Sequence, residues 1–170
     1  MAPRPRAAST PLVAVARGLA AGVVGTAVMT AAQMLWAKSQ PAPEPSGPAD
    51  GDPWADASMP ALVAKKIGEG LFDTQVSAER IPVLTNAMHW GYGTSWGVVF
   101  GLAAPSVPAR PVRNGLLFGT AVMAMSYAQL VPMGIYRPPW TYPAKDIATE
   151  LGFHLAYGLG VAGGHRAIVR

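Results

Sequence analysis

Apolar and polar positions alternate in long blocks along the chain and divide it into four apolar stretches of helical length. Residues 12–36 are apolar apart from Arg17, a few small hydroxyl side chains and Gln33. At 1.5 Å per residue this stretch reaches roughly 37 Å, enough to cross a hydrocarbon core of about 30 Å. The other three stretches are residues 83–104, 114–131 and 147–165. The pattern predicts an all-α fold, an integral membrane four-helix bundle.

The segments outside these spans are polar and differ from one another. Residues 1–11 form a basic, proline-rich leader that we expect to be disordered, and residues 12–170 form the expected membrane domain. In the long loop 37–82, residues 40–53 have the proline-rich, acidic composition of an extended linker. Residues 60–72 carry apolar side chains at helical spacing. They predict a short amphipathic helix that either lies on the membrane surface or caps the bundle.

Charged residues are divided unevenly between the two ends of the expected bundle. Of the 13 basic residues, seven arginines lie on the side of both termini and the 105–113 turn, where there is no acidic residue. All nine acidic residues lie on the opposite side. Because short basic loops remain in the cytoplasm, we expect a multi-pass inner-membrane protein with both termini cytoplasmic and the loop 37–82 exoplasmic. A cleaved signal peptide is the alternative for the first span, although its apolar run is longer than usual.

Composition agrees with lipid as the solvent around the chain. Hydrophobic residues make up 51% of the sequence and charged residues 13%, about half of the ~25% found in soluble domains. The net charge of +4 is not arranged in a basic stripe or interleaved with aromatic residues, which argues against nucleic-acid binding. The absence of cysteine excludes disulfides and cysteine nucleophiles. No catalytic motif argues positively for an enzyme.

Two short patterns occur twice and suggest an internal repeat. The sequence Gly-Thr-Ala-Val-Met occupies residues 25–29 and again 119–123, and His-x-x-Tyr-Gly occupies 89–93 and 154–158. Two helical hairpins in tandem, related by an axis along the membrane normal, would produce this arrangement. Chance similarity between Ala/Gly-rich helices is the alternative. In either case, glycines four residues apart predict close contact between helix backbones.

Ionisable and hydrogen-bonding side chains gather in the outer half of the expected spans. Both His89 and His154 are expected roughly 10 Å below the outer boundary. Glu150 and Tyr157 share one helix face with His154 because they lie four and three residues from it. Polar groups within a membrane usually face the bundle interior. The predicted intramembrane site comprises Gln33, His89, Tyr92, Gln129, Glu150, His154 and Tyr157.

Several interpretations of this site stay open. The histidines His89 and His154 could be axial ligands of a b-type haem, or could bind a divalent metal together with Glu150. A pathway for protons or a small solute is the third interpretation. The fourth is a structural network in which Glu150 pairs with His154. The leading hypothesis is a small membrane protein that supports a larger complex or passes protons or a solute, as a homo-oligomer or with a partner subunit.

A short stretch near the C-terminus, residues 132–157, resembles a known family. The residues that carry this resemblance are Pro132-Met133-Gly134-Ile135, Pro138-Pro139, Pro143, Glu150 and His154-Leu155. They are similar to the C-terminal signature of the YagU-like inner-membrane proteins, a family of unknown function, over residues 132–157. The chain departs from that family in its short length and its acidic loop. The resemblance implies an integral inner-membrane protein linked to acid tolerance, and it supplies no catalytic residues.

Overall fold

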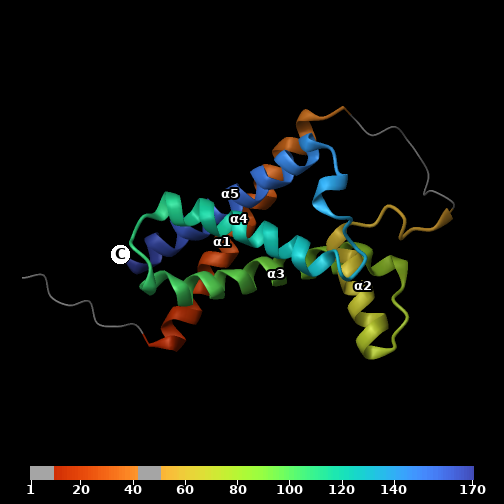
Figure 1. The fold of residues 1–170 in the computed structure, drawn as a ribbon. Helices are drawn as coiled ribbons and strands as arrows, with labels where there is room; N and C mark the ends of the chain where they lie inside the picture. The colour runs from red at the N-terminus through yellow and green to blue at the C-terminus, as the bar shows by residue number, and fades with distance from the viewer. Residues whose placement is uncertain (1–9, 42–50) are drawn as a thin grey trace, which may run out of the picture.

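The computed structural model describes residues 10–41 and 51–170. Every regular element in these two ranges is a helix (Figure 1). The expected leader 1–11 and linker 40–53 fall largely outside the described residues. No strand is present in the described part, so the predicted all-α class is confirmed. The helices are α1 (Pro11–Ser39), α2 (Met59–Phe72), α3 (Ile81–Ala103), α4 (Pro111–Leu130) and α5 (Ala144–Val169), with the 3-10 turns η2 (Ala78–Arg80), η3 (Ala104–Ser106) and η4 (Pro139–Thr141).

Prolines set the beginnings of these helices. Pro11, Pro60, Pro82 and Pro111 each lie in the first turn of a helix, where a missing backbone N–H costs nothing. The helices therefore begin slightly before the expected apolar stretches do. At the far end of α4 the chain turns through Gly134, whose φ of 67° lies in the left-handed region that glycine adopts without strain.

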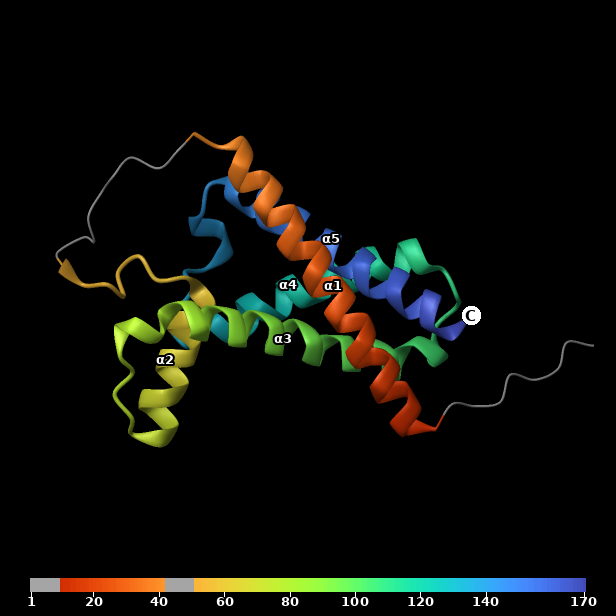
Figure 2. The same cartoon turned by 180° about the vertical axis from the view of Figure 1, so that it is seen from behind.

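Glycines bring the four long helices into contact in the order α3, α1, α5, α4. A Cβ atom on Gly18 of α1 would lie 2.6 Å from the Gly97 carbonyl oxygen of α3. One on Gly115 of α4 would lie 2.8 Å from the Gly158 carbonyl oxygen of α5. Helix α1 crosses α3 obliquely and then runs along α5, as both views show (Figures 1 and 2).

Aromatic side chains fill the wider space between α3 and α4. Phe118 of α4 has its ring centroid 5.0 Å from that of Phe100 and 6.3 Å from that of Trp96, both on α3. Tyr157 of α5 stacks on the opposite side of Phe118, with centroids 6.1 Å apart. These glycine contacts, a further one between Gly25 of α1 and Gly160 of α5, and this aromatic layer therefore close a bundle of α1, α3, α4 and α5.

The two ends of the bundle carry different elements. The start of α1, the turn between α3 and α4 and the C-terminus lie at one end, and α2 and the η4 turn lie at the other (Figures 1 and 2). The basic residues of the first end within the described chain are Arg17, Arg110, Arg113, Arg166 and Arg170.

Among the described helices, α1 alone is both long and apolar enough to cross a membrane by length and composition. Helices α3, α4 and α5 have sufficient length, but polar residues lower their mean hydropathy, among them His89 in α3, Arg113 and Gln129 in α4, and Glu150 and His154 in α5. Because α1 lies near the N-terminus, a signal sequence would satisfy the same criterion. The four-span arrangement is therefore taken up below as a proposal.

Candidate functional site

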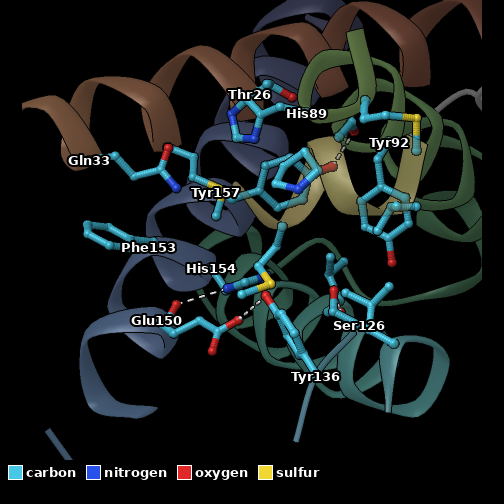
Figure 3. Close-up of a pocket in the computed structure, with 18 of the residues that line it drawn as sticks. Thr26, Gln33, His89, Tyr92, Ser126, Tyr136, Glu150, Phe153, His154 and Tyr157 are labelled. Atoms are coloured by element: carbon cyan, nitrogen blue, oxygen red, sulfur yellow. Dashed lines mark hydrogen bonds between the residues drawn. The ribbon is translucent and has the colours of Figure 1, made fainter. Parts of the chain in front are cut away.

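A cavity of about 820 Å³ lies at the end of the bundle that carries α2 (Figure 3). Its walls come from α1, α2, α3, α4, α5 and the loop that follows α4. Every residue of the predicted polar site lies in these walls, namely Gln33, His89, Tyr92, Gln129, Glu150, His154 and Tyr157. The structure therefore brings together side chains that are distant in the sequence.

Helix α2 covers this cavity. Its side chains Met59, Val63 and Ile67 form part of the lining. The Lys66 ammonium donates a hydrogen bond to the Met133 carbonyl oxygen, across to the loop after α4. Of the two interpretations of residues 60–72, the cap over the bundle is the one that this geometry matches.

The Glu150 carboxylate accepts hydrogen bonds from two tyrosines. The Tyr127 hydroxyl is 2.6 Å from Oε2, and the Tyr136 hydroxyl is 3.2 Å from Oε1. Tyr136 lies in the loop between α4 and α5, where burial and the neighbouring carboxylate raise the pKa of its hydroxyl far above the ordinary value. The Tyr136 hydroxyl therefore keeps its proton and remains a donor to Glu150.

The sequence-based pairing of the Glu150 and His154 side chains is wrong. His154, which is 8% exposed, places Nδ1 at 2.9 Å from the backbone carbonyl oxygen of Glu150, one helical turn earlier. A carbonyl oxygen only accepts, so Nδ1 carries the hydrogen. In the neutral ring Nε2 is then an unprotonated acceptor.

His89 has the opposite tautomer. Its Nε2 is 3.1 Å from the Thr30 hydroxyl oxygen, and that hydroxyl donates its single hydrogen to the Thr26 carbonyl oxygen at 2.8 Å. Nε2 of His89 must then be the donor, which leaves Nδ1 as the acceptor in the neutral ring. Thr30 could not be identified from the sequence, because one hydroxyl in an apolar helix usually bonds only to its own backbone.

Three further residues of the predicted site, Tyr92, Gln129 and Tyr157, take part in separate hydrogen bonds. The Tyr92 hydroxyl donates to Oε1 of Gln129 at 3.0 Å, which joins α3 to α4. The Tyr157 hydroxyl donates to the Gly93 carbonyl oxygen at 2.5 Å, which joins α5 to α3. Gln33 lies in the cavity wall on α1 (Figure 3). The two His-x-x-Tyr-Gly segments thus meet, since the tyrosine of one bonds to the glycine of the other.

The metal hypothesis for His89, Glu150 and His154 gains no support from this geometry. Within residues 10–41 and 51–170 no three His, Cys, Asp or Glu side chains are grouped closely enough to hold a metal ion. The residues that could ligate a haem are His89 and His154, each of which retains one unprotonated ring nitrogen. The haem hypothesis stays a prediction, and optical absorption of the purified protein would test it.

Two residues that contribute to this site were not included in the site predicted from the sequence. Tyr136 lies in the proline-rich loop after α4 and bonds to Glu150. Ser126 lines the cavity, and its hydroxyl donates to the Val122 carbonyl oxygen at 3.0 Å. A carboxylate in an apolar helix needs donors, and that requirement was the available signal for Tyr136.

No family model matches the chain, and no curated protein or solved structure matches it significantly. The resemblance of residues 132–157 to the YagU-like proteins therefore stays a prediction. Function has to be argued from the fold and the cavity.

Proposed function

We propose that this protein crosses the membrane four times, with both termini in the cytoplasm, and binds a small solute in its cavity from the exoplasmic side. In this proposal α1, α3, α4 and α5 are the spans, and α2 is a cap over the exoplasmic opening. The YagU-like resemblance agrees with an inner-membrane location.

The distribution of side chains between surface and interior carries this proposal. Large apolar side chains lie on the outer surface of all four long helices, among them Leu35, Val83, Leu117 and Leu159. In the interior, Thr26 and Ser126 are buried with His154. Water would disfavour such extensive apolar exposure, whereas hydrocarbon accommodates it and favours polar groups turned inward.

The charges at the two ends support the orientation. Arg110 lies in the α3–α4 turn and Arg113 in the first turn of α4. The last helix ends near Arg166 and Arg170, and no acidic side chain lies at that end in the described residues. The end with α2 contains the acidic residues. Because positive charge in short loops stays in the cytoplasm, the cavity opens toward the exoplasmic side.

The half of the bundle on the proposed cytoplasmic side is closed, which favours a binding site over an open channel. Below the cavity, Trp96, Phe100 and Phe118 pack edge to face between α3 and α4. On the other faces, glycines hold the helix backbones in contact. A solute entering from the exoplasmic side meets this layer, so passage to the cytoplasm requires the layer to open.

The tandem hairpin hypothesis is part of the proposal. Glycines join α1 to α3 and α4 to α5, which are the pairs that the sequence repeat would produce, and they also join α1 to α5 across the two hairpins. Such a thin bundle would be stabilised further by a second copy or a partner subunit.

Cysteine labelling tests the topology, because the chain has no cysteine of its own. Two exposed alanines provide matched sites, Ala55 before α2 and Ala109 in the α3–α4 turn. In intact cells a membrane-impermeant maleimide should label Ala55→Cys, and it should label Ala109→Cys only after lysis. Equal labelling of both variants in intact cells would overturn the four-span topology.

A further inference from the structure

Most hydroxyl groups around the cavity donate their hydrogens to other groups of the protein. Tyr92 donates to Gln129, Tyr157 to the Gly93 carbonyl oxygen and Tyr136 to Glu150. Ser126 and Thr26 donate to the carbonyl oxygens one turn earlier in their own helices. What these groups offer a ligand is therefore oxygen lone pairs, which accept hydrogen bonds.

The ionisable side chains add further acceptors. In their neutral forms His89 presents Nδ1 and His154 presents Nε2, as derived above from their partners. The Glu150 carboxylate has two oxygens, and each accepts one tyrosine hydrogen, so lone pairs remain. At the start of α5, Lys145 and Asp146 also line the cavity and offset one another in charge. The net charge of the lining is therefore that of the Glu150 carboxylate.

Apolar and aromatic groups make up most of the rest of the lining. The aromatic rings are those of Trp36, Tyr92, Tyr136, Phe153 and Tyr157. The faces of such rings attract cations, more strongly where water is excluded. The thioethers of Met29, Met59, Met88 and Met133 adapt to apolar ligands of varied shape.

We infer that the cavity binds an amphipathic organic cation, an apolar or aromatic body that carries a protonated amine. This inference rests on the proposed function and names the class of solute. The ammonium group supplies N–H donors to the Glu150 carboxylate and the histidine acceptors, and the apolar body occupies the methionine and aromatic walls. The lining residues with side-chain donors to spare are Gln33, Trp36, Gln129, Lys145 and Thr149. Of these only Lys145 is charged, so an anion would meet Glu150 with little compensation.

Three ligands that share one ring system test this inference. The full-length protein is placed in nanodiscs of zwitterionic lipid, and calorimetry measures the binding of 2-naphthylmethylamine, 2-naphthylmethanol and 2-naphthoate. Empty nanodiscs correct for partition into lipid. The amine should bind about tenfold or more tightly than the alcohol, as a charge-assisted hydrogen bond implies, and the carboxylate should bind weakest.

Two variants locate the charge preference. Glu150→Gln should abolish the preference for the amine over the alcohol, while Glu79→Gln, which removes an exposed carboxylate of η2 outside the cavity, should retain it. Equal binding of all three ligands to the unmodified protein would overturn the cation inference and leave the proposed solute site standing. A preference for the carboxylate would do the same. Binding of none of the three would overturn both.

Discussion

The Glu150 carboxylate accepts one tyrosine hydrogen on each of its two oxygens. It lies on α5, yet its donors come from α4 and from the loop after α4, so one side chain ties three segments together. Hydrogen bonds to charged groups contribute about 1.5–3 kcal/mol each, compared with about 0.5–1.5 kcal/mol for neutral pairs. We therefore expect this cluster to fix the position of the loop over the cavity.

Removal of one donor to Glu150 should destabilise the protein more than removal of a neutral hydrogen bond. Tyr127→Phe deletes the hydroxyl that lies 2.6 Å from the carboxylate. Tyr92→Phe is the matched control, because its hydroxyl donates to the neutral Gln129 amide at 3.0 Å. The free energy of unfolding in detergent should fall by about 1 kcal/mol more for Tyr127→Phe than for Tyr92→Phe. An equal loss for both variants would contradict the special role of Glu150.

At the scale of residues, the sequence predicted which side chains lie together but not how they pair. His89, Glu150 and His154, which were grouped from the sequence by depth and helix face, all line the cavity. Their partners depended on the path of the proline-rich loop, which places Tyr136 on Glu150, and on side-chain torsions, which turn His154 toward a backbone carbonyl. Neither follows from periodicity.

At the scale of helices, glycine contacts decide the packing. Gly119 of α4 lies against the His154 carbonyl of α5, and Gly22 of α1 lies against the backbone at Thr94 of α3. Helix positions were largely predictable because prolines bound the apolar stretches. The pairing of α1 with α5 was not predicted, since it links separate hairpins and leaves no local pattern.

A methyl group at the α4–α5 contact should separate the two helices. Gly119→Ala places a Cβ against the His154 carbonyl oxygen, so the free energy of unfolding should fall by about 1–3 kcal/mol. Gly152→Ala on α5 is the control, because nothing lies within 4 Å of its added Cβ. That variant should be neutral or more stable by up to about 1 kcal/mol, through higher helix propensity. Unfolding titrations of both variants in the same detergent give the comparison, and a tolerated Gly119→Ala would contradict the close packing.

At the scale of the whole molecule, the account depends on which solvent surrounds the bundle. Four apolar stretches were visible in the sequence, but three of them are interrupted by glycine and by polar or charged residues, several of which line the cavity. Hydropathy alone therefore identifies α1 and leaves the others below the threshold for a span. The apolar surface of α3, α4 and α5 becomes apparent only when side chains are sorted into outward and inward positions.

Two adjacent residues of α4 test the surrounding solvent most directly. Met125 is 41% exposed on the outer surface, whereas Ser126 is 7% exposed and lines the cavity. The test compares the rates at which Met125→Cys and Ser126→Cys, each in the native membrane, react with a small water-soluble thiol reagent added to the exoplasmic side. The account predicts that Ser126→Cys reacts through the cavity and that Met125→Cys, in lipid, does not. Faster reaction of Met125→Cys, the order that exposure to water would produce, would contradict it.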